Sequence, residues 1–352
     1  MGLLSQWVQL CLGIHAKFRT SAAPATCCSR GCCLGKSTLL DYRMSPLESY
    51  PIISLRKEDV LAPEEMGSKR KGWVQVAGDS ERWLFKYARL SNGQVTGEHW
   101  AEKVAAEVAG LLHIPHARVE LATLEGSPGC ISRRFPELAR PGAELIHGND
   151  LLAGAGFGYD RTKQFRQSDH TVENILAAIS HVFSDPAEQA AAFRQMAGYL
   201  VLDAIILNTD RHHENWAIVR LMHQDGRVSH EMAPTFDHAS SLGRNEPPDK
   251  LATWLSDPER PEWYAARSQC RGGIYLRSDD AHGANPLRLL ELVARKWREY
   301  FVPWLPQVEN VHADALCDTV DRVPSETMVQ AQRDFTKALL RVTYRRVKDI
   351  LS

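Results

Sequence analysis

The sequence has little cysteine beyond its first 33 residues, almost no net charge, no long apolar run and no internal repeat. Its three later cysteines, Cys130, Cys270 and Cys317, are scattered, which argues against a disulfide framework and indicates a reducing cytoplasm. A net charge of −1 argues against a general attraction to nucleic acid or to an anionic membrane. Because a membrane-spanning helix needs about 20 apolar residues, we predict a cytoplasmic protein with no membrane partner and no direct nucleic-acid binding.

Residues 1–43 differ in composition from the rest of the chain. Their apolar run, Leu3–Ile14, is too short to span a bilayer and lacks the charged start of a signal peptide. The cysteine cluster Cys27–Cys33 does not have the ligand spacing of a zinc finger. Gly31–Thr38 ends like a P-loop, but Arg30 stands where the first glycine belongs and no strand precedes it. We expect this segment to be disordered or to precede the true initiator, Met44.

The remaining chain is long enough to bury a sizeable core, and its 44% hydrophobic and 24% charged residues are ordinary for a globular protein. After an undistinguished lead-in at 46–65, a Gly78–Asp79 turn between two apolar runs predicts a hairpin of strands at 73–76 and 82–87. Lys86 is the lone cation among apolar residues of the second strand. A helix should follow, with Thr96 as N-cap and an apolar stripe of Trp100, Val104, Val108 and Leu111.

Further along, periodicity and turn residues predict alternating elements and loops. Strands are expected at 117–122 and 130–135, and a hairpin around Asp225–Gly226. Residues 141–170 read as a surface excursion, and 243–285 as a weakly patterned loop in the place of a substrate or activation loop, containing Arg271–Gly273. Helices are expected at 172–183, 187–207, 286–301 and 325–350.

An acid and an amide five residues apart, Asp210 and Asn215, follow the apolar run Tyr199–Leu207. This arrangement is typical of phosphoryl transfer, in which the Asp orients or deprotonates the attacking hydroxyl and the Asn helps to hold a metal ion. Downstream, Asp237 is followed by small residues that allow a close backbone approach. Magnesium binds a few carboxylate or amide oxygens together with phosphate oxygens and water. We therefore predict Asp237 and Asn215 as Mg²⁺ ligands, Asp210 as the catalytic aspartate, and ATP as the phosphate donor.

Two segments also resemble known families. Asp-Arg-His-x-x-Asn at 210–215 is similar to the catalytic loop of phosphatidylinositol 3/4-kinases. Ala-Pro-x-Phe-Asp-x-x-Ser-Ser-Leu-Gly at 233–243 resembles the HipA-like kinases, the serine/threonine kinases of bacterial toxin–antitoxin systems, over residues 64–350. The resemblance implies a two-lobed, protein-kinase-like α+β fold, with a sheet-plus-helix N-lobe at 44–135 and a mainly helical C-lobe at 136–352. It also implies transfer to a protein Ser or Thr and an antitoxin-like regulator.

The same resemblance implies how the nucleotide is held. A turn containing Gly67, Ser68 and Lys69 would hold phosphates, and Lys86 would pair with the α- and β-phosphates. Backbone groups of the hinge between the lobes, at residues 133–135 (Arg133, Arg134 and Phe135), would contact adenine.

The sequence leaves open which glutamate pairs with Lys86. The helix glutamate that pairs with Lys86 is Glu98 or Glu102, one turn apart, and we favour Glu102 over Glu98 and the more remote Glu107. His212 fits the family position that braces the catalytic loop.

The alternative functions are a phosphoinositide kinase, favoured by the 210–215 pattern, and a non-catalytic nucleotide-binding module. Binding to liposomes would support the first. The complete set of acids argues against the second.

Overall fold

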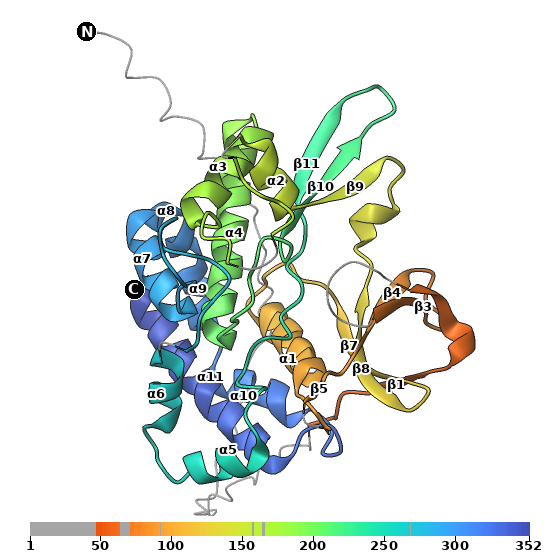
Figure 1. The fold of residues 1–352 in the computed structure, drawn as a ribbon, viewed down its shortest axis with the longest axis vertical. Helices are drawn as coiled ribbons and strands as arrows, with labels where there is room; N and C mark the ends of the chain where they lie inside the picture. The colour runs from red at the N-terminus through yellow and green to blue at the C-terminus, as the bar shows by residue number, and fades with distance from the viewer. Residues whose placement is uncertain (1–46, 64–70, 92, 157, 164–165, 268) are drawn as a thin grey trace, which may run out of the picture. The chain divides into compact units, whose positions relative to one another are not determined.

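A six-stranded sheet dominates the N-terminal part of the protein (Figure 1). The computed structural model describes residues 47–63, 71–91, 93–156, 158–163, 166–267 and 269–352. The strands of the sheet are β1 (Ile52–Leu55), β2 (Val60–Pro63), β3 (Lys71–Gln75), β4 (Arg82–Tyr87), β7 (Val119–Leu124) and β8 (Ser127–Arg133). Their order is β1-β7-β8-β4-β3-β2, and β1 runs parallel to β7 whereas the other neighbours are antiparallel.

The predicted hairpin of β3 and β4 is confirmed, and it determines where Lys86 points. Alternate residues of a strand face opposite sides of a sheet. Trp83 and Phe85 are buried on one face in a small core. Lys86 lies on the other face, opposite Cys130 of β8, where the helix α1 (Glu98–Leu111) packs. Lys86 is therefore directed toward a helix rather than toward solvent.

The lead-in at 46–65 contains more structure than its sequence suggests. It forms β1, a 3₁₀ turn at Lys57–Asp59 and the edge strand β2. Short strands such as these lack the long alternating pattern on which a prediction depends. A two-residue ribbon of β5 (Leu90–Ser91) and β6 (Gln94–Val95) precedes α1.

The helix α1 contacts β7 and β8 as well as the helical part of the protein. Its predicted cap was wrong, because Gly97 rather than Thr96 is the N-cap and no side-chain cap is formed. Trp100, Val104 and Val108 are buried as predicted, but Leu111 is exposed and Leu112 is buried in its place.

The C-terminal part is mainly helical and contains the largest core. Its helices are α2 (Gly148–Gly154), α3 (Val172–Val182), α4 (Pro186–Ile206), α5 (Pro248–Trp254), α6 (Arg260–Ala266), α7 (Pro286–Lys296), α8 (Arg298–Phe301), α9 (Leu305–Asn310), α10 (Ala313–Asp321) and α11 (Gln330–Leu351), with 3₁₀ turns at Pro136–Ala139 and Val302–Trp304. The predicted α+β class is confirmed. The region 243–285 is not a continuous loop, since it contains α5 and α6.

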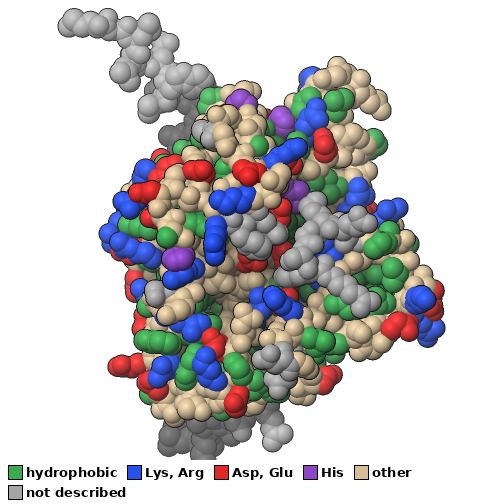
Figure 2. All heavy atoms as spheres, in the orientation of Figure 1, with side chains coloured by type: hydrophobic (Ala, Val, Ile, Leu, Met, Phe, Trp, Pro, Cys, Tyr) green, Lys and Arg blue, Asp and Glu red, His purple; other side chains and the backbone are tan. Residues whose placement is uncertain are grey.

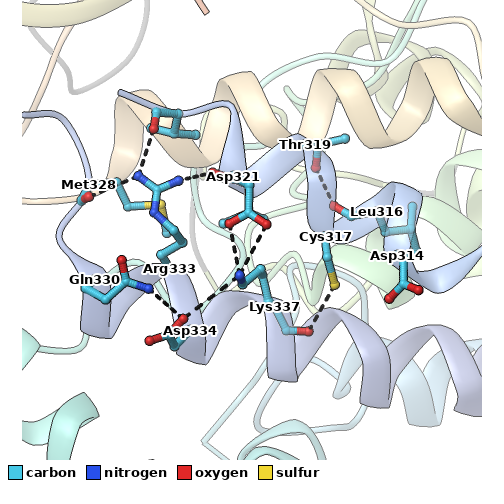
Figure 3. Close-up of polar contacts among 12 residues, drawn as sticks. Asp314, Leu316, Cys317, Thr319, Asp321, Met328, Gln330, Arg333, Asp334 and Lys337 are labelled. Carbon is cyan, nitrogen blue, oxygen red and sulfur yellow. Dashed lines mark hydrogen bonds and ion pairs between the residues drawn. The ribbon is translucent and has the colours of Figure 1, made fainter. Parts of the chain in front are cut away.

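Helix α11 packs against α4, α5, α6, α7 and α10. Figure 3 shows its polar contacts with α10. Arg333 is buried and donates to the carbonyls of Val320 and Val323, at the end of α10 and just beyond it. Lys337 forms an ion pair with Asp321 at 2.9 Å. The bonds of Arg333 engage carbonyls at and just beyond the C-terminal end of α10, where the last carbonyls of a helix lack the usual intrahelical donors. The Lys337–Asp321 ion pair is a second polar link between the two helices.

A second sheet has the order β11-β10-β9 and is antiparallel throughout. The hairpin of β10 (Ala217–Met222) and β11 (Val228–Met232) was predicted. β9 (Ala143–His147) was not, because the Gly, Asp and His residues of 141–170 predict a surface excursion. Instead this segment forms β9 and α2. β9 pairs with β10, the strand that begins directly after Asn215–Trp216.

On the face shown in Figure 2, Lys and Arg side chains are interspersed with Asp and Glu, as expected from the small net charge. Within the described ranges, no helix is both long enough and apolar enough to cross a bilayer.

Candidate active site

The predicted catalytic loop begins where α4 ends. Leu207 caps the helix in the left-handed conformation (φ 51°), and its amide donates to the carbonyl of Asp203. A positive φ is uncommon for a leucine, so the surrounding contacts must hold this turn. Asp203 is the one acid within the apolar run of α4, and it is buried. Its partner determines how the loop is fixed.

That partner is Arg211. Its guanidinium donates from Nε and Nη2 to the two Asp203 carboxylate oxygens at 2.8 and 2.7 Å, and both side chains are almost fully buried. Nη1 also donates to the carbonyls of Asn215 (2.5 Å) and Phe236 (3.4 Å). Burial opposes the charge of Arg211, but the attraction and hydrogen bonds of Asp203 raise its pKa above the usual value. One side chain thus ties the helix, the loop and the residue before Asp237 together.

Asp210 and Asn215 are held by the turn between them. The Asn215 Nδ2 donates to the Asp210 carbonyl at 2.7 Å, and the Asp210 amide donates to Asn208 Oδ1 at 3.1 Å. Because the amide nitrogen of Asn215 is used in this way, its Oδ1 is the atom available as a metal ligand. On the Asp210 carboxylate, Oδ2 accepts a hydrogen bond from Ser240 Oγ at 3.3 Å.

Asp237 follows β11 and has a positive φ of 57°. Such a conformation is tolerated by Asp more readily than by most residues, and it concentrates at functional sites. After this turn, Thr209 donates to the Ser240 carbonyl from both its amide and its hydroxyl, at 2.9 and 3.0 Å. The segment that carries Asp237 is therefore joined directly to the loop that carries Asp210.

Lys86 reaches this site from the sheet. Its Nζ lies 3.2 Å from Asp237 Oδ1 and 3.9 Å from Glu102 Oε2 of α1. Burial opposes protonation of Lys86, but the nearby carboxylates of Asp237 and Glu102 raise its pKa well above the ordinary range. Lys86 is accordingly a fixed positive charge between the sheet, α1 and the Asp237 turn.

The geometry distinguishes the two glutamates that the sequence left open. Glu102 is the one near Lys86, whereas Glu98 Oε1 lies 3.1 Å from Arg244 Nη1. Arg244 Nη2 in turn donates to Ser240 Oγ at 2.8 Å. The more remote candidate, Glu107, forms an ion pair with Lys103 at 2.7 Å.

Histidines support the loop from both sides. His212 Nδ1 accepts a hydrogen bond from the Glu214 amide at 3.2 Å, within the loop. His213, which had no predicted role, is buried, and its Nδ1 lies 2.8 Å from the Tyr159 hydroxyl. His170 accepts from Trp216 Nε1 at 3.1 Å and donates to the Gly273 carbonyl at 2.8 Å. Burial lowers the pKa of His170 to about 3, so this ring is a neutral part of the scaffold.

The predicted hinge lies at the end of β8 and beside the Asp237 turn. The amides of Arg133 and Arg134 donate to the carbonyls of Arg118 and Arg82, so both are already used in the sheet. The first amide beyond these pairings belongs to Phe135, whose ring packs 5.8 Å from that of Phe236.

The predicted phosphate turn and the predicted metal site are the two remaining parts of the site. Gly67, Ser68 and Lys69, predicted to form the phosphate turn, lie outside the described residues. Among the residues that are described, no three His, Cys, Asp or Glu side chains converge as a ready metal site. The oxygen donors of Asp237 and Asn215 nevertheless fit Mg²⁺, provided that nucleotide phosphates and water complete its coordination.

Taken together, a strand lysine paired with a helix glutamate, a loop carrying Asp and Asn, and a further Asp after a hairpin define the class of kinase-like folds. The chain belongs to the HipA-like C-terminal domain family, whose model matches residues 61–296. A search of curated protein sequences gives no match.

Two solved structures share this fold. The proinflammatory kinase CtkA of Helicobacter pylori has 16% sequence identity and a TM-score of 0.68, covering 86% of this chain and 96% of CtkA. HipA of Shewanella oneidensis MR-1, from a complex with HipB and operator DNA, has 10% identity and a TM-score of 0.51, covering 82% of this chain and 65% of HipA. The predicted kinase-like fold is thereby confirmed.

Several residues at the site had no predicted role, among them Asp203, Arg211, Ser240 and Arg244. A single acid inside the apolar run Tyr199–Leu207 is a signal for a buried ion pair, and it could have identified Asp203. Nothing in the local sequence distinguishes Ser240 from Ser241, or Arg244 from an exposed arginine.

Proposed function

We propose that this protein is an ATP- and Mg²⁺-dependent phosphotransferase that transfers the γ-phosphate to the hydroxyl of a protein Ser or Thr. The observation that supports this most strongly is the convergence of Lys86, Glu102 and Asp237 from the sheet, α1 and the hairpin, directly joined to the loop of Asp210 and Asn215. Such a set positions charges around transferring phosphate, which accounts for most of the catalysis of this reaction.

Each residue has a defined task in this proposal. Lys86, kept charged by Asp237 and Glu102, would contact the α- and β-phosphates. Asp237 and Asn215 Oδ1 would hold Mg²⁺, which neutralises phosphate charge when it is bound. Asp210 would orient the acceptor hydroxyl and accept its proton. His212 would brace the loop through its bond to the Glu214 amide.

The nucleotide base and the lobes are assigned by the same reasoning. We propose that lobes at 44–135 and 136–352 meet at the hinge, and that adenine lies against the backbone from Phe135 onward, because the amides of Arg133 and Arg134 are engaged in the sheet. The turn of Gly67, Ser68 and Lys69 would cover the phosphates.

The acceptor is the least defined part of the proposal. A protein acceptor agrees with the HipA-like family, and the HipA–HipB complex suggests an antitoxin-like regulator for this chain as well. The Asp-Arg-His-x-x-Asn pattern at 210–215 favours a phosphoinositide as the second candidate.

The test is incubation of the purified chain with Mg²⁺ and γ-labelled ATP, alone, with cell lysate, and with phosphatidylinositol vesicles. Asp210→Ala should abolish labelling while leaving the circular dichroism spectrum unchanged. Asp225→Ala, at the exposed turn of the β10–β11 hairpin, is the matched control and should retain full activity. Labelled lipid without labelled protein would select the lipid kinase. Magnesium-dependent ATP binding without transfer to either acceptor would indicate a non-catalytic module.

A further inference from the structure

A chain of polar contacts connects Asp210 to α1 through two residues outside the predicted motifs. Ser240 Oγ donates to Asp210 Oδ2 at 3.3 Å, Arg244 Nη2 donates to Ser240 Oγ at 2.8 Å, and Arg244 Nη1 lies 3.1 Å from Glu98 Oε1. A serine hydroxyl has a single hydrogen to donate. Since the guanidinium can only donate, the hydroxyl hydrogen of Ser240 is left for Asp210, and the direction of the chain is fixed.

The Arg244–Glu98 ion pair is buried, and the two links through Ser240 are partly buried. The side chains of Arg244 and Glu98 are 7% and 5% exposed. An exposed ion pair contributes little, but a buried one holds its partners firmly, because separating them leaves a charge without water. The backbone adds a second link, since the Gly97 amide at the start of α1 donates to the Arg244 carbonyl at 3.4 Å.

The helix α1 thereby contacts both halves of the site. Glu98 and Glu102 lie one helical turn apart and on the same side of the helix. Glu102 is next to Lys86, on the side proposed to bind nucleotide, whereas Glu98 acts through Arg244 and Ser240 toward Asp210, on the acceptor side. A displacement of α1 would disturb both sides together.

We propose that Arg244 is a positioning residue that, through Ser240, makes the orientation of the Asp210 carboxylate depend on the position of α1. The inference rests on the proposed function, in which Asp210 orients the acceptor. A hydrogen bond to one carboxylate oxygen limits rotation of the group, and donation from a guanidinium strengthens the hydroxyl that provides it. Without Arg244, Asp210 keeps its place in the loop, but its carboxylate is oriented less precisely. A small misplacement of a catalytic group can greatly lower the reaction rate.

The kinetic test compares Ser240→Ala, Arg244→Met and the double variant in the full-length chain. The reaction is release of inorganic phosphate from Mg²⁺–ATP in a single turnover, which needs no identified acceptor. We expect each single variant to lower the rate constant about ten- to hundredfold, with the Kd for ATP unchanged. The double variant should be no slower than Arg244→Met, because the two residues act in series.

Ser241→Ala is the matched control. Its hydroxyl is buried, and it donates to the His238 carbonyl at 2.7 Å and not to Asp210. This variant should keep the wild-type rate constant. The inference would be overturned by additive losses of rate in the double variant or by an equal loss of rate in Ser241→Ala. It would also be overturned if the main effect of the variants were weaker binding of ATP.

A second measurement does not depend on activity. Hydrogen exchange of peptides covering residues 207–215 should be faster in Arg244→Met, Ser240→Ala and Glu98→Gln than in the wild type, and unchanged in Ser241→Ala. If the wild type neither releases phosphate beyond the Asp210→Ala background nor labels protein or lipid with γ-labelled ATP, the proposed function fails. The link to α1 is still decided by the exchange, and unchanged exchange in Arg244→Met and Glu98→Gln would refute it.

Discussion

Arg211 and Arg244 are both buried arginines beside the predicted catalytic loop, but their surroundings differ. Arg211 has a bidentate carboxylate and two carbonyls as partners, all from the hairpin, the loop and α4. Arg244 has one carboxylate contact with α1 and donates to the Ser240 hydroxyl and to Asn245 Oδ1. Burial lowers the pKa of both groups. At Arg211 the attraction of Asp203 reverses the shift, whereas at Arg244 burial prevails and the pKa stays below its usual value.

This difference separates a fixed side of the site from an adjustable one. The contacts of Arg211 compensate its burial and stay within the C-terminal part of the chain. The contacts of Arg244 compensate its own burial incompletely. They reach α1, the helix that packs on the N-terminal sheet. We therefore expect changes near Arg211 to affect stability first, and changes near Arg244 to affect catalysis first.

The largest effect is expected for Arg211→Met. Removing Arg211 leaves the buried Asp203 carboxylate without its ion-pair partner and with only the hydrogen bond from Asn208 Nδ2, and breaking a buried pair in this way costs about 3–5 kcal/mol. Urea unfolding followed by tryptophan fluorescence should show this loss in the free energy of unfolding. The paired variant Arg211→Met/Asp203→Leu removes both charges and should recover part of the loss. If Arg244→Met proved the more destabilising of the two single variants, the distinction between the two sides would be wrong.

A smaller but still large effect is expected for Gly273→Ala. A Cβ at this position would lie 2.6 Å from the backbone of Arg211 and His212, where neither side can yield easily. Displacing the loop or the 271–275 segment should cost about 2–3 kcal/mol and should lower the rate of phosphate release. Gly154→Ala at the end of α2 is the control, since nothing lies within 4 Å of its Cβ. A Gly273→Ala chain as stable as Gly154→Ala would show that the fixed side is more adaptable than its contacts indicate.

Acid should weaken the fixed side through His170. Burial lowers the pKa of His170 in the folded protein to about 3, below the ordinary value of about 6.5. Between these two pH values the imidazole is protonated in the unfolded chain but neutral in the folded protein. The stability contributed by the neutral ring is complete above pH 6.5 and is lost as the pH falls toward 3, with about 2 kcal/mol lost at pH 5. His170→Gln should flatten the decline in the free energy of unfolding between pH 7 and pH 5. An unaltered slope would show that this histidine is not responsible.

The sequence was most informative where a pattern is long or chemically unusual. The β3–β4 hairpin, α3, α4 and the β10–β11 hairpin follow from periodicity and turn residues, and a lysine flanked by aromatic residues in β4 led to Lys86 and Glu102. Short elements such as β1, β9 and α5 have too few residues for a period to be visible. Ser240 and Arg244 were missed for a different reason: their importance comes from partners far away in the chain, Asp210 and Glu98, and no local pattern encodes such pairs.

Helix α11 has a consequence for how the protein is made. Thr343 donates to the Ile205 carbonyl just before the catalytic loop, and Thr336 donates to the Leu242 carbonyl in the segment after Asp237. Both supports belong to a helix that is synthesised after every other described element. A nascent chain on the ribosome would thus have its sheet, α1 and both acidic segments before it has the helix that holds those segments from behind. Phosphoryl transfer should accordingly be absent from ribosome-bound chains that end before α11, and begin once this helix has docked.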